Sequence, residues 1–177
     1  MSSDRLTPTS YAVLVLVGRG GAGPHDLVRM MRQGRIYESA AESQYYAEPK
    51  RLERLGYLRS RRLPGQTHER THYELTAKGL RALRDWVSTR PEHPRVGADA
   101  ILRLLAADLV GEGPVKESLL TMRADLGDLR ARLDVAEEVA GTLPHREKYL
   151  RLNHRLARRI LDAYDAWLRE VERELDG

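Results

Sequence analysis

Apolar residues in the second half of the chain recur at the spacing of two long helices. From Leu119 to Ala140 they step alternately by three and four residues, and the same steps return from Leu150 to Leu175. Such steps keep all members on one helix face, which another apolar surface has to cover. Because the segment GTLPH at residues 141–145 interrupts the pattern, the sequence predicts two helices that pair antiparallel.

The last of these helices carries a second apolar stripe, which is more than one partner helix can cover. A second subunit would bury this stripe, so we expect a homodimer; a hairpin inside a monomer is the alternative interpretation of the heptads. The residues expected at the dimer contact lie on both helices: Leu126, Leu133, Leu152, Leu156, Ile160, Tyr164, Trp167, Leu168 and Val171.

The first 90 residues have a mixed pattern that begins with three helices. Thr7 and Pro8 are typical of a helix start, and this helix runs through Val17. A second helix is expected over residues 24–33. A third lies in SQYYAEPKRLERLGYL at residues 43–58, closed at its C-terminal cap by a glycine.

A hairpin and a fourth helix follow. Two short strands are expected over residues 57–62 and 71–75, on either side of a turn at Pro64 and Gly65, and Thr76 then caps a helix. Three helices, a hairpin and a helix are the order of a winged helix-turn-helix domain. In that domain the third helix enters the DNA major groove, and the hairpin tip reaches the backbone or the minor groove.

The two halves of the chain meet in a polar stretch with two prolines, STRPEHPRVG at residues 88–97. This stretch ends one helix and precedes another. We therefore expect a winged helix-turn-helix domain over residues 1–90, a linker over 91–97, and a helical domain for dimerisation and effector binding over 98–177. The expected fold class is mainly α with a small β-hairpin wing.

Positive charge is concentrated in the first domain. Residues 1–90 carry a net charge of +7, whereas residues 91–177 carry −3. Residues 50–62 contain six lysines and arginines against one acid, which favours a polyanionic partner over an ordinary solvated face. The candidate DNA contacts lie on the third helix and the hairpin: Ser43, Gln44, Tyr45, Tyr46, Lys50, Arg51, Arg54, Arg61, Arg62, Gln66, Thr67, His68 and Arg70.

The third helix contains a proline at position 49. Inside a helix, Pro49 would remove the hydrogen bond to the Tyr45 carbonyl group, at a cost of about 3 kcal/mol. We therefore expect regular helix to begin near Glu48, with Pro49 at its first position and residues 43–47 in a separate turn.

The motifs of the first domain resemble those of the PadR family of transcriptional regulators. The family pattern has a tyrosine in the recognition helix, then K-R-L-E-x-x-G, then Y-x-L-T-x-x-G and a tryptophan on the next helix. The matching residues are Tyr46, Lys50, Arg51, Leu52, Glu53, Gly56, Tyr73, Leu75, Thr76, Gly79 and Trp86. The chain departs from the commonest pattern at Tyr45, Ala47 and Pro49.

This resemblance implies a winged-helix regulator with a helical C-terminal region that dimerises and sometimes shapes an effector pocket. We expect a homodimeric repressor that binds an inverted-repeat operator in double-stranded DNA and that a small-molecule effector releases. Trp86 and Trp167 are the candidate effector contacts, with core aromatic residues as the alternative interpretation. A winged-helix module that binds another protein is the alternative function.

A nucleotide-binding fingerprint competes with this interpretation. GRGGAG at residues 18–23 fits G-x-G-x-x-G, follows the strand-like run AVLVLV and precedes a helix. Pro24, however, stands where a backbone N–H would bind pyrophosphate, and the rest of the chain lacks the alternating strands and helices of a parallel sheet. A turn between two helices is therefore the favoured interpretation.

Other classes of site have little support. The chain has no cysteine, which excludes disulfides, thiolate nucleophiles and thiolate zinc sites. Its six histidines lack metal-ligand spacing, and no serine, histidine and acid group has the context of a nucleophile, so we expect no metal, no cofactor and no enzymatic activity. With no apolar run of about 18 residues, we expect a soluble cytoplasmic protein without a membrane partner.

Overall fold

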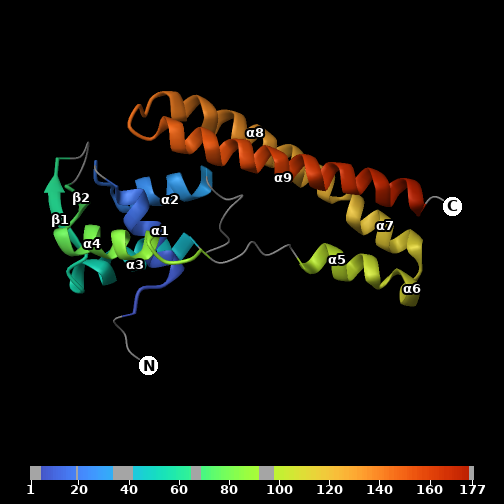
Figure 1. Ribbon diagram of the computed structural model, residues 1–177, viewed down its shortest axis with the longest axis horizontal. Helices are drawn as coiled ribbons and strands as arrows, with labels where there is room; N and C mark the ends of the chain where they lie inside the picture. Colours follow the sequence, from blue (N-terminus) through green and yellow to red (C-terminus); the bar gives the residue numbers. More distant parts are fainter. Residues whose placement is uncertain (1–4, 19, 34–41, 65–68, 92–97, 176–177) are drawn as a thin grey trace. The chain divides into compact units, whose positions relative to one another are not determined.

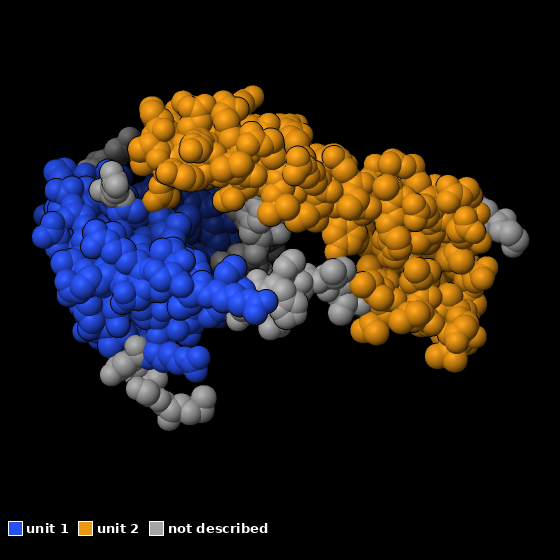
Figure 2. All heavy atoms as spheres, in the orientation of Figure 1, with its two compact units in different colours: residues 1–92 blue, residues 93–177 orange. Residues whose placement is uncertain are grey.

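The structure is a computed structural model that describes residues 5–18, 20–33, 42–64, 69–91 and 98–175. The chain divides into two compact units, Met1–Glu92 and His93–Gly177 (Figure 2). Most of the expected linker, residues 92–97, lies outside the described residues.

The first unit has the predicted order of elements, with three helices, an antiparallel hairpin and a fourth helix (Figure 1). These elements are α1 (Pro8–Val17), α2 (Pro24–Gln33), α3 (Glu42–Arg54), β1 (Leu58–Leu63), β2 (Arg70–Leu75) and α4 (Ala77–Val87). The expected fold class, mainly α with a hairpin wing, is confirmed.

Side-chain caps explain where two of these helices begin. At α1, the Thr7 hydroxyl accepts a hydrogen bond from the Ser10 N–H at 3.2 Å, and the Ser10 hydroxyl accepts one from the Thr7 N–H at 2.8 Å. At α4, the Thr76 hydroxyl accepts from the Gly79 N–H at 3.1 Å. These caps satisfy N–H groups that lack partners inside the helix, and each stabilises its helix by about 1 kcal/mol.

The core of the first unit lies between its helices and the hairpin. Fully buried apolar side chains contribute roughly 1.5–3 kcal/mol each. The buried apolar residues are Val13, Leu14, Val17, Ala22, Leu27, Val28, Met31, Tyr45, Leu52, Leu58 and Tyr73.

The expectation of a late start for the third helix is wrong. The helix α3 begins at Glu42 and continues through Pro49. Tyr45, Pro49 and Leu52 are all buried, and their spacing of four and three residues places them on one face. Burial of this face against the core offsets the local cost of the proline. The sequence reveals this cost but does not reveal the packing that offsets it.

The glycine-rich segment at residues 18–23 lies between α1 and α2. The preceding apolar run belongs to α1, which is a helix and not a strand. Ala22 forms a bridge with Tyr73 on β2, with backbone hydrogen bonds of 3.0 and 2.9 Å. The segment therefore joins the hairpin, and the described residues contain only a two-stranded antiparallel sheet in place of the parallel sheet that a dinucleotide fold requires.

The second unit is helical over its described residues. Its elements are α5 (Ala98–Leu105), α6 (Ala107–Val110), α7 (Glu112–Leu120), α8 (Met122–Gly141) and α9 (Glu147–Glu174). The two long helices α8 and α9 lie side by side (Figure 1). Their ion pairs join Arg123 to Glu172 and Arg130 to Asp162, so residue numbers fall along α9 as they rise along α8. The predicted antiparallel pair is confirmed.

This pairing corrects part of the expected dimer contact. Leu126 and Leu133 on α8, together with Leu168 and Val171 on α9, are buried within the second unit. Heptad residues face the nearest helix, and here that helix belongs to the same chain. Tyr164 and Trp167 are half-buried, whereas the remaining three residues stay exposed, at 49%, 52% and 38% for Leu152, Leu156 and Ile160.

A second exposed apolar surface lies on α5 and α6, which the heptads do not reveal. Its exposed members are Ile101, Leu102, Leu105, Leu109 and Val110. Within the described part of the chain, no helix has the length and apolar character needed to cross a membrane.

Candidate nucleic-acid interface

One face of α3 is free of core contacts. Its exposed residues are Ser43, Gln44, Tyr46, Ala47, Lys50 and Arg54. Tyr46, Lys50 and Arg54 follow one another at intervals of four residues, which places a phenol and two cations in one row along the helix. These are the side chains of α3 that a large polyanion can reach.

Tyr45 does not belong to this face. The structure contradicts its expected role at DNA, because only 1% of the residue is exposed. Successive residues on a helix are rotated by about 100°. Since α3 starts earlier than predicted, this rotation directs Tyr45 into the core and Tyr46, 39% exposed, toward the surface.

The Arg51 side chain also forms its contacts within the first unit. Its guanidinium donates to the Glu48 carboxylate at 2.7 Å and to the Arg5 carbonyl oxygen at 2.7 Å. The Ser10 hydroxyl donates to the same carboxylate at 2.6 Å. Arg51 therefore ties α3 to the N-terminal end of α1, and the expectation that it is available to phosphates does not hold.

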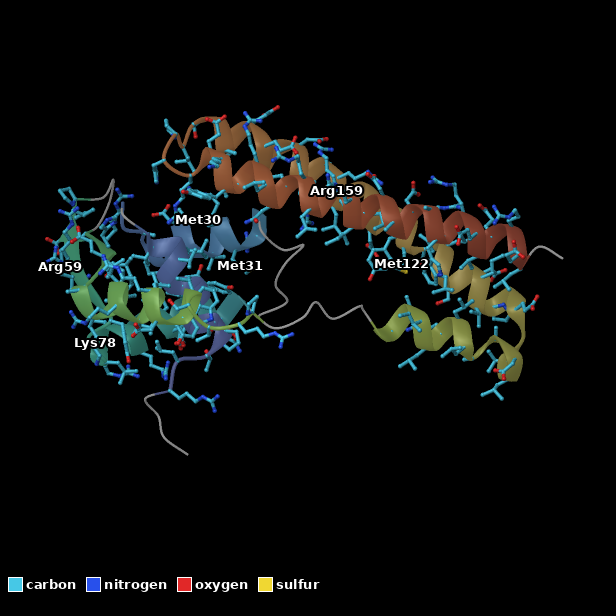
Figure 3. All side chains as sticks on the ribbon, viewed as in Figure 1. Met30, Met31, Arg59, Lys78, Met122 and Arg159 are labelled. Atoms are coloured by element: carbon cyan, nitrogen blue, oxygen red, sulfur yellow. The ribbon has the colours of Figure 1, made fainter. Side chains whose placement is uncertain are left out.

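The hairpin presents arginines on both of its faces. In its antiparallel register Arg59 pairs with Glu74, Arg61 with His72, and Arg62 with Thr71. Figure 3 places the Arg59 side chain on the hairpin. Both Arg59 and Arg61 donate to the Glu74 carboxylate, each at 2.9 Å.

Arg62 and Arg70 are exposed hairpin residues for which no ion pair is found among the described residues. The expected contacts at the hairpin tip, Gln66, Thr67 and His68, lie outside the described residues.

Four exposed cations of α3 and the hairpin have no carboxylate partner among the described residues. Lys50, Arg54, Arg62 and Arg70 form no ion pair with another described residue, and all four are exposed. In the second unit, the exposed Arg132, Arg155 and Arg159 likewise have no ion pair with a described residue, and carboxylates pair with seven further arginines. Such ion-paired arginines are Arg103, Arg123, Arg130, Arg151, Arg158, Arg169 and Arg173. Uncompensated positive charge therefore lies on α3 and the hairpin, and also on α8 and α9 of the second unit.

Gly56 and Thr76 of the family motifs, together with Lys78, hold the C-terminal end of α3. Gly56 has φ of +76°, and the Tyr57 N–H donates to the Leu52 carbonyl oxygen at 2.9 Å, as in a Schellman cap. Lys78 on α4, labelled in Figure 3, donates to the Leu55 carbonyl oxygen at 2.7 Å. The Thr76 hydroxyl donates to the Gly56 carbonyl oxygen at 2.8 Å. Together these contacts join the C-terminal end of α3 to the start of α4.

A polar cluster links α3 to the inner face of the hairpin. The Ser60 hydroxyl donates a hydrogen bond to the Glu53 carboxylate. Burial raises the pKa of the Tyr73 phenol, the nearby Glu53 carboxylate raises it further, and Arg62 opposes both effects. Glu53 therefore acts within the fold, which accounts for an acid inside the basic segment.

The two candidate effector residues lie in different surroundings. The Trp86 ring on α4 stacks on the Tyr11 ring of α1, with centroids 4.7 Å apart and an angle of 9° between the rings. Trp86 is nevertheless 41% exposed. Trp167 is half-buried on α9. No group of three or more potential metal-binding side chains occurs in the portion of the molecule that the structure describes.

Sequence reasoning missed one residue of this surface, His25 at the start of α2. Its Nδ1 atom lies 3.3 Å from the Tyr46 hydroxyl oxygen. The two residues are separated by 21 positions, and the predicted elements contain no signal that brings them together. Only the packing of α2 against α3 does so.

Solved structures match the chain over most of its length, whereas no protein-family model and no curated protein matches the sequence. Bacillus subtilis PadR in complex with operator DNA is 22% identical, covers 95% of this chain and 99% of its own, and has a TM-score of 0.70. The same protein with p-coumaric acid is 24% identical, with coverages of 95% and 98% and a TM-score of 0.68. The Vibrio cholerae virulence activator AphA is 21% identical, with coverages of 94% and 97% and a TM-score of 0.71.

The TM-scores establish a common fold, and the shared coverage includes both units of the chain. The matching structures include a transcriptional regulator and a virulence activator. The chain thus has the winged-helix fold of the PadR-type transcriptional regulators, as its sequence motifs predict.

Proposed function

We propose that the chain is a sequence-specific DNA-binding transcriptional regulator that acts as a homodimeric repressor at an inverted-repeat operator. The observation that carries this proposal is the set of four exposed cations without ion pairs in the described residues: Lys50, Arg54, Arg62 and Arg70. They lie on the helix and hairpin with which winged-helix domains contact DNA. Each contact with a phosphate releases counterions, so affinity should fall steeply as salt rises.

Dimerisation is supported by the apolar surface that the second unit leaves exposed. Leu152, Leu156 and Ile160 form a stripe at intervals of four residues along α9, with Tyr149 exposed one turn before them. A twofold axis through a contact of this kind would present two copies of α3 to successive half-sites about 34 Å apart.

Regulation by a small molecule is the second part of the proposal. Bacillus subtilis PadR has been solved both with operator DNA and with p-coumaric acid. By analogy, an effector of this chain would bind preferentially to a conformation that does not fit the operator, and so release it. Trp86 and Trp167 remain the candidate contacts for such a molecule.

A fluorescence-anisotropy titration tests the DNA-binding proposal. The full chain is titrated into labelled duplex from upstream of its own coding region and into a scrambled duplex, at two salt concentrations. The proposal predicts tight binding to the first duplex that weakens with salt. Absence of binding to either duplex at low salt would contradict it and would favour a protein-interaction module.

The direction of regulation needs a separate test, because the matching structures include a protein described as an activator. A reporter gene is placed behind the bound duplex, and its expression is compared with and without the chain. Repression predicts lower expression with the chain present, and higher expression would identify an activator.

A further inference from the structure

His25 and Tyr46 form a directional contact between α2 and α3. The Tyr46 hydroxyl oxygen lies 3.3 Å from His25 Nδ1. Their rings meet edge to face, with centroids 5.7 Å apart and an angle of 79° between the ring planes. Edge-to-face packing is one of the favoured arrangements of two aromatic rings, and it restricts the orientation of both.

The pair lies at the exposed edge of an otherwise apolar contact between these helices. Leu27, Val28 and Met31 of α2 belong to the same buried core as Tyr45 and Leu52 of α3. That core holds the two helices together without His25. Because His25 and Tyr46 are both exposed, the contact adds little burial, and holding the fold together does not require it.

Tyr46 occupies the row of α3 side chains that carries uncompensated charge. Lys50 follows it by one turn and Arg54 by two. A phenol hydroxyl has one donor and two acceptor positions, and the contact with His25 uses one of these three. Two positions remain for a nucleic acid, and the ring offers an apolar face for a thymine methyl group.

We propose that His25 is a positioning residue that holds the Tyr46 phenol in the orientation in which it reads a base edge of the operator. The inference rests on the proposed function as a DNA-binding regulator. A side chain ordered before binding loses less conformational freedom in the complex than a freely rotating one. His25 therefore increases affinity for the cognate sequence, whereas the lysine and arginine contacts with phosphates supply the sequence-independent part.

The structure identifies which ring nitrogen matters, and this permits a selective rescue. The contact uses Nδ1, whose position the side-chain amide of an asparagine approximates; the longer glutamine places its amide nearer to Nε2. His25→Asn should therefore retain the contact, whereas His25→Ala and His25→Gln should lose it. A residue that only fills space would show the opposite preference, because glutamine is closer to histidine in size.

The test uses duplexes that the wild-type full-length chain enriches from a random DNA library. Affinity for the enriched duplex and for a random duplex is measured for His25→Ala, His25→Asn, His25→Gln and Tyr46→Phe. We expect His25→Ala, His25→Gln and Tyr46→Phe each to weaken binding to the enriched duplex about threefold to tenfold, the range for loss of one hydrogen bond. His25→Asn should stay within about twofold of wild type, a smaller effect than loss of that bond.

A double variant separates positioning from an independent contact. If His25 acts through the tyrosine hydroxyl, His25→Ala combined with Tyr46→Phe should bind no more weakly than Tyr46→Phe alone. Binding to the random duplex and thermal unfolding should remain close to wild type for each variant. His145→Ala, which changes an exposed histidine of the second unit, is the matched control.

The outcomes distinguish this inference from the function on which it rests. Enrichment of no sequence by the wild-type chain would contradict the proposed function and the inference together. Enrichment followed by equal affinity of the wild-type chain and His25→Ala would overturn the inference alone. The inference would also be overturned if the two losses of affinity multiplied in the double variant, or if glutamine and not asparagine restored binding.

Discussion

Gly79 on α4 packs so closely against Tyr57 that a Cβ atom on Gly79 would lie 2.3 Å from the Tyr57 carbonyl oxygen. The clash would be with backbone, which cannot rotate away as a flexible side chain can. We predict that Gly79→Ala lowers the free energy of unfolding by about 1–3 kcal/mol, measured by urea denaturation.

Gly20→Ala is the matched control in the same unit, because no atom lies within 4 Å of the added Cβ. Its effect should stay within about 0.5 kcal/mol of wild type. If both variants were equally stable, α4 could not pack as closely against Tyr57 as described.

Substitution of the two adjacent tyrosines of α3 should affect different properties, stability for Tyr45 and DNA binding for Tyr46. Tyr45→Ala removes a buried aromatic ring from the core and should lower the free energy of unfolding by about 3–5 kcal/mol. Tyr46→Ala should cost less than about 1 kcal/mol, because the ring is exposed, and should instead weaken DNA binding. The reverse order of stabilities would show that α3 is rotated relative to the described structure.

These two tyrosines show which feature of α3 the sequence does not predict, namely the side that each residue faces. The motifs predict a third helix and its cap at Gly56, because these depend on neighbouring residues. Whether Tyr45 or Tyr46 faces the core depends on where the helix begins. That start depends on the burial of Pro49, to which residues distant in the sequence contribute. Local propensity favoured a break at the proline, and tertiary packing overrode it.

His154 should make the stability of the second unit depend on pH. The residue is buried on α9, and its Nδ1 atom has no hydrogen-bond partner within the described ranges. Burial lowers the pKa of its imidazole; Arg158 and Arg151 lower it further, and Glu137 opposes them. Because the folded state favours the neutral ring, stability should be complete above about pH 6.5 and fall as the pH drops toward the folded-state pKa.

Thermal unfolding between pH 7.5 and 5.5 measures this effect. His154→Leu should lose less stability than wild type as the pH falls, while His145→Leu, at an exposed position, should follow wild type. The Glu137 carboxylate, whose pKa Arg158 lowers, would lose its contribution only below about pH 4.3, outside this range. Identical pH profiles for wild type and His154→Leu would contradict the prediction.

The exposed stripe of α9 should control oligomeric state. Leu156→Glu and Ile160→Glu together place two charges in this stripe and should convert a dimer into a monomer of 20.2 kDa in sedimentation equilibrium. Arg155→Glu, at a neighbouring exposed position, is the control and should remain dimeric. A wild-type chain that sediments as a monomer would contradict the dimer proposal.

For the second unit, the sequence predicts the two long helices but not which of their apolar residues face another subunit. The heptads predict α8 and α9 because the apolar stripe of each helix packs against the other helix, which follows it closely in the sequence. They do not indicate whether Leu133 or Leu156 faces another subunit, because both have the spacing of an apolar stripe. Likewise, the bridge between Ala22 and Tyr73 joins residues 51 positions apart, and no local pattern encodes it.

The salt dependence of DNA binding tests the central claim most directly. Log Kd for the upstream duplex is measured against log salt for the wild-type chain and for Lys50→Ala combined with Arg54→Ala. Arg130→Ala combined with Arg169→Ala is the control, because it also removes two positive charges but from arginines that carboxylates already pair. We predict that the first double variant weakens binding and reduces the slope by about two, whereas the control keeps the wild-type slope. Equal slopes and affinities for all three proteins would show that α3 does not contact DNA.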